Sequence, residues 1–402
     1  MADEVTRTEH VGWIERMIDS IKGVLIGLLL FAVSFPLLFW NEGRAVRRAQ
    51  DLEEGRGAVV EANPAAVDPS QEGRLVHLSG TASTTETLAD RELGPAAQGA
   101  LRLRRAVEMY QWVEHRETRT NSNTGGSQTR TTRITYSREW RTEAVDSTRF
   151  DQARDHVNPP MPVRSASFDA QAVTLGARAL TPQLTAQVEG FRPLPVQPAQ
   201  VPALAQFGRP VHAMPEGVYV GMDANSPTIG DLRVRWEVAP SAVVTVLAAQ
   251  RGSSFADWST PSGRTLEQNL EMGSVTAAQM FTNLETGNVM MTWALRFLGW
   301  FMMFAGISMI TKPLVVVADV IPLIGSLVGA GTGLFAFLVS APLSLITVAT
   351  GWLFYRPLLG VGLLALGVGI AVGVGKLAAS RGREQNAQRH AQRHAQAHFP
   401  AG

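Results

Sequence analysis

GVLIGLLLFAVSFPLLFW is the sequence of residues 23–40, and it decides the class of this protein. Ser34 is its only polar side chain. An α-helix needs about 20 mostly apolar residues to cross the hydrocarbon core of a bilayer. The stretch is too long for the apolar part of a signal peptide, and no small-residue cleavage site follows it. We therefore expect a retained membrane-spanning helix.

Three further apolar stretches lie in the last third of the chain: residues 292–311, 333–354 and 358–375. Arg296 lies one turn inside the first of them, from where its long side chain can reach the interface. Residues 312–332 contain Asp319 and Pro322 among apolar residues. This pattern predicts an interfacial or re-entrant segment, or an extension of the third span. Four spans place both termini on one side of the membrane.

Basic residues near the span ends predict the orientation. The chain has three lysines: Lys22, Lys312 and Lys376. All three fall on the side of the termini, and an excess of basic residues marks the cytoplasmic side. Residues 41–291 are then periplasmic or luminal. Three arginines after the first span, Arg44, Arg47 and Arg48, argue for the reverse orientation. Four aromatic residues fall at one predicted interface, as an aromatic belt does: Trp40, Trp293, Trp352 and Tyr355.

The two terminal segments have different patterns. Residues 1–22 form a cytoplasmic segment in which apolar side chains recur at helical spacing from Val11 to Ile21. This predicts an amphipathic helix that either lies in the interface or leads into the first span. Residues 376–402 form a His- and Arg-rich cytoplasmic tail. Its His390, His394 and His398 have the spacing of metal ligands on one helix face, but the repetitive polar composition favours disorder without a metal.

Residues 41–291 are a large polar domain. They contain 25 arginines and 28 acidic residues. The whole chain is near neutral, with 36 basic and 35 acidic residues, so it has no overall attraction for nucleic acid. The chain has no cysteine, which excludes disulfides and thiolate chemistry. The fold class expected is a membrane α-helical bundle of four spans plus a large β-rich α+β extracytoplasmic domain.

Local patterns place the elements of this domain. Alternation in residues 107–119 and 131–141, around a polar turn at 121–128, predicts a projecting hairpin. Other strands are expected at residues 74–80, 172–176, 217–221, 231–238 and 242–251. Helices are expected at residues 45–54, continuing the first span, and at 147–156, 181–189 and 274–287, the last with Ser274 as N-cap. Residues 191–202, with four prolines, are expected to be a loop.

No residue is assigned a catalytic, cofactor-binding or metal-binding role, because no motif for such chemistry is present. Asp151, Asp155 and His156 form a charge cluster at a predicted helix end, without a nucleophile beside them. Asp319 is the only carboxylate in the membrane half, either in an ion relay or at the interface. Close helix packing, within the chain or between copies, is predicted by small-residue motifs at Gly23 and Gly27, at Gly325, Gly329 and Gly333, and at Gly369 and Gly373.

Several motifs resemble one known family. They are SFPLLFWNEGRAV (34–46), RRAVEMYQW (104–112), YSREWR (136–141), GDLRV (230–234), VVTVLAAQRG (243–252) and GWLFYRPL (351–358). Together they resemble the transmembrane protein 43 (LUMA) family from about residue 12 to residue 376. The resemblance implies four spans, a large luminal loop and self-association. Eukaryotic members lie in the endoplasmic reticulum and inner nuclear membrane and organise protein complexes there. The richness in Ala, Arg and Gly suggests a bacterial member in an inner membrane, to which nuclear partners do not apply.

The function expected is that of a non-enzymatic membrane scaffold. Its partners would be the lipid bilayer, further copies of the chain and unidentified membrane proteins, with no nucleic acid and no cofactor. The alternative is an ion or small-solute transporter or channel, supported by Asp319 and the interruption near Pro322. A lipid-modifying enzyme is a third reading, which requires Asp155, His156 and another polar ligand in one cleft.

Overall fold

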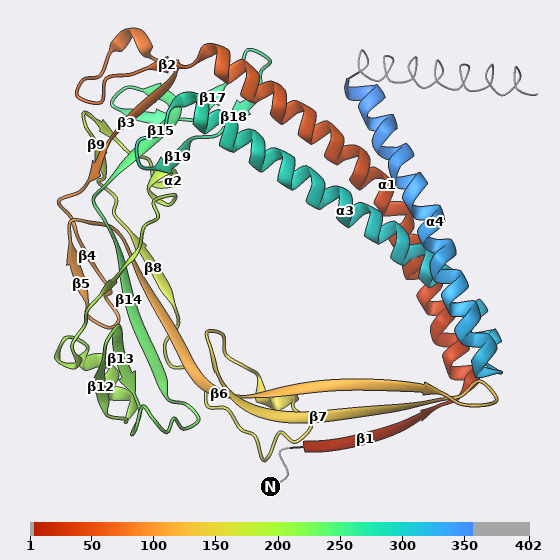
Figure 1. Cartoon of the computed structure of the whole chain (residues 1–402). Coiled ribbons are helices and arrows are strands. Elements are labelled where there is room, and N and C mark those ends of the chain that lie inside the picture. Colours follow the sequence, from red (N-terminus) through yellow and green to blue (C-terminus); the bar gives the residue numbers. More distant parts are fainter. Residues whose placement is uncertain (1–3, 357–402) are drawn as a thin grey trace, which may run out of the picture. The chain divides into compact units, whose positions relative to one another are not determined.

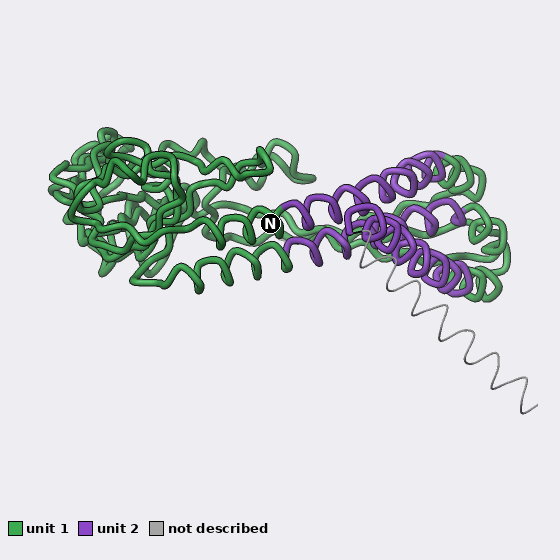
Figure 2. Tube along the Cα trace, turned by 90° about the horizontal axis from the view of Figure 1, so that it is seen from above, with its two compact units in different colours: residues 1–21, 48–290, 313–329 green, residues 22–47, 291–312, 330–402 purple. Residues whose placement is uncertain are grey.

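The computed structural model describes residues 4–356, and its contacts divide them into two compact units (Figure 2). Unit 1 contains residues 4–21, 48–290 and 313–329. Unit 2 contains residues 22–47, 291–312 and 330–356. Unit 1 holds all the strands, and unit 2 is entirely helical apart from its last residue.

Three long helices are apolar enough to cross a membrane: α1 (Trp13–Ala58), α3 (Ala277–Ala318) and α4 (Pro322–Tyr355) (Figure 1). The predicted spans 23–40, 292–311 and 333–354 each lie inside one of them. At 1.5 Å per residue the 46 residues of α1 extend roughly 69 Å, well beyond the hydrocarbon core. The predicted fourth span, 358–375, and the tail 376–402 with its three histidines lie outside the described residues.

Residues 312–332 do not form a separate element. The helix α3 continues to Ala318, a short turn follows, and α4 begins at Pro322. Pro322 suits the first turn of a helix, because its missing N–H would have no partner there. The segment therefore lengthens both helices. At its other end α3 begins at Ala277, with the N-cap at Thr276, whose hydroxyl accepts from the N–H of Gln279 at 3.2 Å, and not at Ser274 as predicted.

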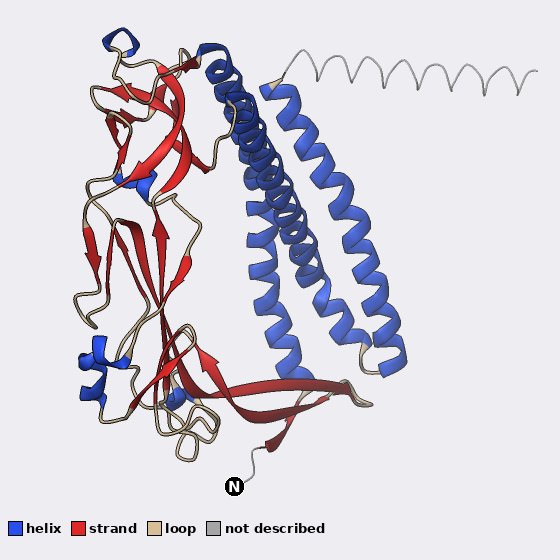
Figure 3. Ribbon diagram, turned by 60° about the vertical axis from the view of Figure 1, so that its left-hand side comes forward, coloured by secondary structure: helices blue, strands red, loops and turns tan. Residues whose placement is uncertain are grey.

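The larger sheet of unit 1 is antiparallel and has eight strands (Figure 3). Its main order is β1-β7-β6-β14-β13-β12, with β8 beside β6 and β11 beside β14. The strands are β1 (Glu4–Val11), β6 (Ala100–Ser122), β7 (Gln128–Arg141), β8 (Ala166–Asp169), β11 (Arg192–Leu194), β12 (Val211–Met214), β13 (Gly217–Val220) and β14 (Leu232–Pro240). The predicted strands at 217–221 and 231–238 are confirmed, whereas residues 191–202 contain β11 as well as loop.

The second sheet has seven strands in the order β10-β9-β3-β15-β16, with β19 beside β15 and the parallel β2 beside β3. Its strands are β2 (Val60–Glu61), β3 (Leu75–Ser83), β9 (Thr174–Leu175), β10 (Arg178–Ala179), β15 (Ala242–Arg251), β16 (Ser254–Ala256) and β19 (Asn269–Met272). Two small ladders pair β4 (Thr87–Ala89) with β5 (Ala96–Gln98), and β17 (Trp258–Ser259) with β18 (Thr265–Leu266). The predicted strands at 74–80 and 242–251 are confirmed, and only two residues of 172–176 are extended.

Unit 1 has two apolar clusters. The larger draws on both sheets and includes Val76, Leu103 and the fully buried Trp236. The smaller packs Leu52 of α1 and Phe281 of α3 with side chains of the second sheet. Full burial of one such aliphatic or aromatic side chain stabilises the fold by about 1.5–3 kcal/mol. These contacts explain why residues 45–54 continue the first helix, as predicted, and why α3 begins within unit 1.

The predicted hairpin is confirmed and is longer than expected. The strand β6 pairs with β14 in its first half and with β7 from Met109 to Ser122. Side chains of β6 alternate between buried and partly exposed as far as Glu114, and from His115 to Asn121 they are all exposed. The second half of β6 thus leaves the core as an arm. Gly125 and Gly126, both with positive φ, form its turn.

One predicted helix is absent, and a second is shorter than predicted. Residues 147–156 contain only the 3-10 turn η2 (Ser147–Arg149), because β-sheet side chains engage the following amides. The N–H of Asp151 donates to Glu114 at 2.6 Å, and that of Gln152 donates to the Tyr136 hydroxyl at 2.9 Å. Residues 181–189 contain the four-residue α2 (Pro182–Thr185). The remaining 3-10 turns are η1 (Pro69–Gln71), η3 (Pro198–Gln200) and η4 (Pro202–Phe207).

The strand β1 was not expected from the sequence. Glu4 to Val11 pair in register with Thr135 to Gln128 of β7. Ladder hydrogen bonds require contact, so β1 and the hairpin lie in the same compartment. A single bilayer crossing by α1 would instead place residues 1–22 and 41–291 on opposite sides, as the charge count predicts. The sidedness of residues 1–22 and 41–291 stays a prediction, and the ladder offers a way to test it.

A paired cysteine substitution tests this ladder. Thr8 and Thr131 are cross-strand partners, and their Cα atoms should be about 4.5–5.5 Å apart, within disulfide range. In the cysteine-free chain, Thr8→Cys with Thr131→Cys should form a disulfide in native membranes, detected as a mass loss of intact protein. Thr8→Cys with Thr118→Cys is the matched control, since Thr118 is on β6, one strand further away. Thiols that stay free at 8 and 131 and react from opposite sides of sealed vesicles would contradict the ladder.

Candidate functional site

A charged network holds the three helices of unit 2 together. Glu42 of α1 is 1% exposed, and both its oxygens accept from Arg296 of α3 at 2.7 Å. Trp352 of α4 donates its indole N–H to the same carboxylate at 2.7 Å. The Arg296 guanidinium also lies over the rings of Trp293 and Trp352. A bidentate, charge-assisted pair of this kind is among the strongest polar contacts in proteins.

Further polar groups surround this ion pair. Asn41 donates to the carbonyl of Thr292 at 3.1 Å, and Arg44 donates to the Thr292 hydroxyl at 3.0 Å. Glycine allows the helices to approach: a Cβ on Gly43 would lie 2.4 Å from the Tyr355 ring, and one on Gly351 would lie 2.9 Å from Glu42. Polar side chains and close backbones both favour helix association in a membrane.

An apolar groove lies beside this network and has a volume of about 270 Å³. All three helices contribute to its lining, which consists of Leu38, Trp293, Arg296, Phe297, Trp300, Ser344, Leu345 and Val348. The groove combines an apolar surface with one guanidinium group. Such a surface suits the chain of an amphiphile better than a polar solute.

A second buried ion pair lies in unit 1, where the hairpin turn meets the start of α1 and the α3–α4 turn. Arg16 bonds to Asp319, and both side chains are 8% exposed. Ser122 also donates to Asp319, at 3.4 Å. The N–H of Gly125 donates to the carbonyl of Val320 at 3.0 Å. Asp319 thus connects three segments that are far apart in the sequence.

Close contact is built into this junction. The Trp13 indole donates to the carbonyl of Val316 at 3.0 Å. A Cβ on Gly126 would lie 2.4 Å from that indole, and one on Gly325 would overlap the Asp319 carboxylate. Gly325 of the predicted small-residue motif therefore makes room for a side chain of its own chain.

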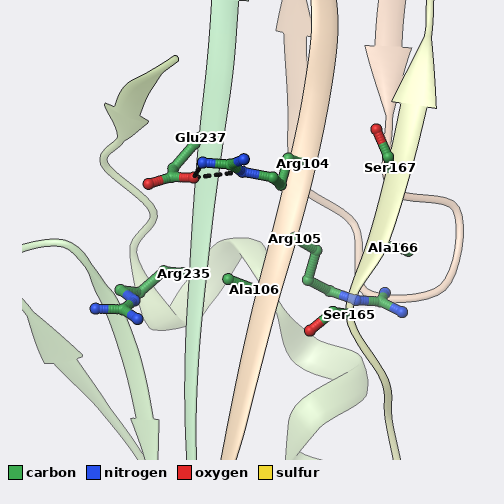
Figure 4. Close-up of a pocket in the computed structure, with 8 residues that line it drawn as sticks. All are labelled: Arg104, Arg105, Ala106, Ser165, Ala166, Ser167, Arg235 and Glu237. Atoms are coloured by element: carbon green, nitrogen blue, oxygen red, sulfur yellow. Dashed lines mark hydrogen bonds and ion pairs between the residues drawn. The ribbon is translucent and has the colours of Figure 1, made fainter. Parts of the chain in front are cut away.

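The outer face of the larger sheet carries an open hollow of about 560 Å³ between β8 and β14 (Figure 4). Arg104 pairs with Glu237 across it at 2.5 Å, and Arg235 faces Glu108 at 3.4 Å. Arg105, the next residue on β6, points to the core and pairs with the buried Asp90 at 2.8 Å. The hollow therefore presents paired charges of both signs.

In the cluster predicted around His156, the histidine is buried and the two aspartates have different surroundings. His156 is 1% exposed and stacks on Tyr136 at a ring distance of 3.7 Å. Asp151 pairs with Arg7 of β1 at 2.8 Å, while Asp155 is exposed. Asp155 and His156 are thus not brought into one cleft. Across residues 4–356 no three His, Cys, Asp or Glu side chains are arranged to hold a metal ion.

Tyr136 and Glu114 are coupled in this cluster. Burial and a 2.8 Å hydrogen bond to Glu114 raise the pKa of Tyr136 to about 12. Burial alone would raise the pKa of Glu114, but hydrogen bonds from Asp151, Arg116 and Tyr136 lower it. Tyr219 is a second case, since burial and a hydrogen bond to Asp231 raise its pKa.

Comparison with known proteins decides the family. The model of the family described as Transmembrane protein 43 matches residues 109–357. Human Transmembrane protein 43 is 38% identical over 373 residues, covering 88% of this chain and 91% of its own length. This chain belongs to the transmembrane protein 43 family. The Drosophila melanogaster homolog is 29% identical, covering 85% of this chain and 91% of its own. No solved structure matches this family member.

The glycine motifs of this transmembrane protein 43 relative differ in how closely another helix approaches them. Gly27 of α1 lies close to Gly306 of α3. A Cβ added to Gly27 would lie 2.7 Å from the Gly306 carbonyl oxygen. The motif Gly23–Gly27 therefore packs helices within the chain. A Cβ on Gly333 would meet no atom of residues 4–356 within 4 Å. The motif at 369 and 373 lies outside the described residues.

The sequence did not predict the Glu42–Arg296 and Arg16–Asp319 ion pairs, although it drew attention to one residue of each pair. Glu42 lies two residues after the first predicted span, and Arg296 lies one turn inside the second, so opposite charges lie at adjoining ends of two consecutive spans. Arg296 was expected only to reach toward the interface. Asp319 was singled out, but its partner Arg16 is 303 residues away and has no local pattern that identifies it.

Removal of Arg16 tests the hairpin junction. Arg16→Ala leaves the Asp319 carboxylate buried without its cation, which should cost about 3–5 kcal/mol of docking free energy. Amide hydrogen exchange of residues 122–128, including Gly125, should accelerate strongly. Arg7→Ala is the control, because its pair with Asp151 involves a 65% exposed arginine and should contribute about 1 kcal/mol or less. Equal exchange in the two variants would show that the Arg16–Asp319 pair does not hold the turn.

The Tyr136 pKa gives a pH prediction. An unfolded tyrosine titrates near pH 10, whereas folded Tyr136 titrates near 12. The folded state keeps its proton longer, so this contribution to stability is complete below pH 10 and is lost as the pH rises to 12. Between pH 10 and 12 the free energy of unfolding should fall less in Tyr136→Phe than in the unchanged protein. The fall that remains is the contribution of Tyr219. Tyr110→Phe on β6 is the control. A slope unchanged by Tyr136→Phe would refute the assignment.

Proposed function

We propose that this protein is a non-catalytic membrane scaffold. In this proposal the helices anchor the chain and pack with further copies, and the β-rich domain contacts other membrane proteins. Membership of the transmembrane protein 43 family supports the membrane location. The resemblance to eukaryotic members that organise endomembrane complexes supports the scaffold role.

The observation that carries the proposal is the exposed apolar surface of the helices. Only 17%, 22% and 17% of the most apolar windows of α1, α3 and α4 are buried within the structure. Phe297, Leu338 and Leu345 are each more than half exposed. Such surfaces need lipid or further helices to cover them.

Two features support association with other proteins. On α4 a Cβ added at Gly331 or Gly333 would meet nothing within 4 Å in the described chain, so another helix could approach the backbone there. The hollow beside β14 presents Arg104, Arg235 and Glu237 at the surface. Paired charges in a concave surface favour specific contact with a partner of complementary charge.

Mass measurement tests the scaffold. Full-length protein solubilised in mild detergent and corrected for bound detergent should have a mass well above 43.4 kDa, the mass of one chain. Two differently tagged copies expressed together should purify as one complex. Gly333→Leu should weaken this association, whereas Gly57→Leu, at another open helical glycine in unit 1, should not. A strict monomer that brings no other protein with it would contradict the proposal.

A further inference from the structure

The groove beside Glu42 has room for a segment of one hydrocarbon chain. Its volume of about 270 Å³ lies just below the range of about 300–1,000 Å³ typical of pockets for whole drug-sized molecules. Most of its lining is aliphatic or aromatic, from Leu38 of α1 to Val348 of α4. The volume and lining fit a segment of a single acyl chain.

The surroundings of the groove indicate a lipid as the occupant. Trp293 and Phe297 at its rim are each 63% exposed, and Leu345 is 68% exposed. These residues belong to helices that are apolar enough to cross a membrane. A bilayer lipid is the molecule in contact with such a surface, and its chains are the natural filling of an apolar groove there.

One end of the groove is polar. Arg296 lines it and is 17% exposed, although Glu42 accepts from two of its nitrogens. A guanidinium has five N–H donors, so donors remain for the oxygens of a lipid head group or glycerol ester. Trp293 and Trp352 lie beside it, as is usual where a helix meets the membrane interface.

The charge of the same helix ends selects the head group. In unit 2 these ends carry four arginines and one carboxylate, a net charge of +3: Arg44, Arg47, Arg296, Arg356 and Glu42. Basic pockets between membrane helices bind anionic head groups. We propose that unit 2 binds an anionic glycerophospholipid, with one acyl chain in the groove and its phosphate at these arginines.

Native mass spectrometry of the full-length protein in mild detergent tests this site with two probes, phosphatidylglycerol and phosphatidylcholine. Phosphatidylglycerol should bind with one tight site, about tenfold or more tighter than phosphatidylcholine. Leu345→Trp, which fills the groove, should weaken that site about tenfold, through the loss of buried methylene contacts. Ile346→Trp is the matched control, because Ile346 is 59% exposed on the same helix and does not line the groove.

A second variant distinguishes the contribution of the lipid head group to binding from that of the acyl chain. Arg47→Gln should weaken phosphatidylglycerol about fivefold and leave phosphatidylcholine unchanged, as expected for one basic residue near the surface. Equal affinity for the two lipids would overturn the anionic selectivity. Equal affinity of Leu345→Trp and Ile346→Trp would overturn the groove as the chain site, and would show that the lipid bound is only a general coating of the helices.

Discussion

A carboxylate inside an apolar helical bundle must be neutralised, and Glu42 imposes this condition on unit 2. It is the one carboxylate among that unit's described residues. Burial of an isolated ion costs several kcal/mol, and a well-formed partner offsets this cost. Arg296 and Trp352 supply the partners, one from each of the other helices. The ion pair therefore fixes the register of three helices that apolar packing alone would leave free to slide, and it forms the polar end of the groove.

The same requirement organises unit 1. The alternation of β6 turns Arg105 to the core between Leu103 and Val107, where the buried Asp90 neutralises it. Asp319, in the turn between two apolar helices, is neutralised by Arg16. The Glu42–Arg296 and Arg16–Asp319 pairs join segments that are distant in the sequence, whereas Arg105 and Asp90 are 15 residues apart. In all three cases a charge in a buried position determines which segments come together.

The regular elements were largely predictable, because local patterns determine them. The apolar runs predicted the spans inside α1, α3 and α4, and period-two alternation predicted β6, β7 and β14. One helix prediction failed because side chains distant in the sequence accept hydrogen bonds from backbone N–H groups. Residues 147–156 do not form a helix, because Glu114 and Tyr136 bind the N–H groups that would begin it. The strand β1 was missed because its partners on β7 are 117 to 131 residues away.

By itself the sequence determined that this is a membrane protein with a β-rich polar domain, and its motifs identified the family. Apolar length and alternation are local properties, so they could be read along the chain. Only the tertiary structure decided the partner of each buried charge, the pairing of β1 with the hairpin, and the packing of Gly27 against Gly306. These contacts depend on which segments meet in space. Desolvation and close packing act between residues hundreds of positions apart, and no local pattern records them.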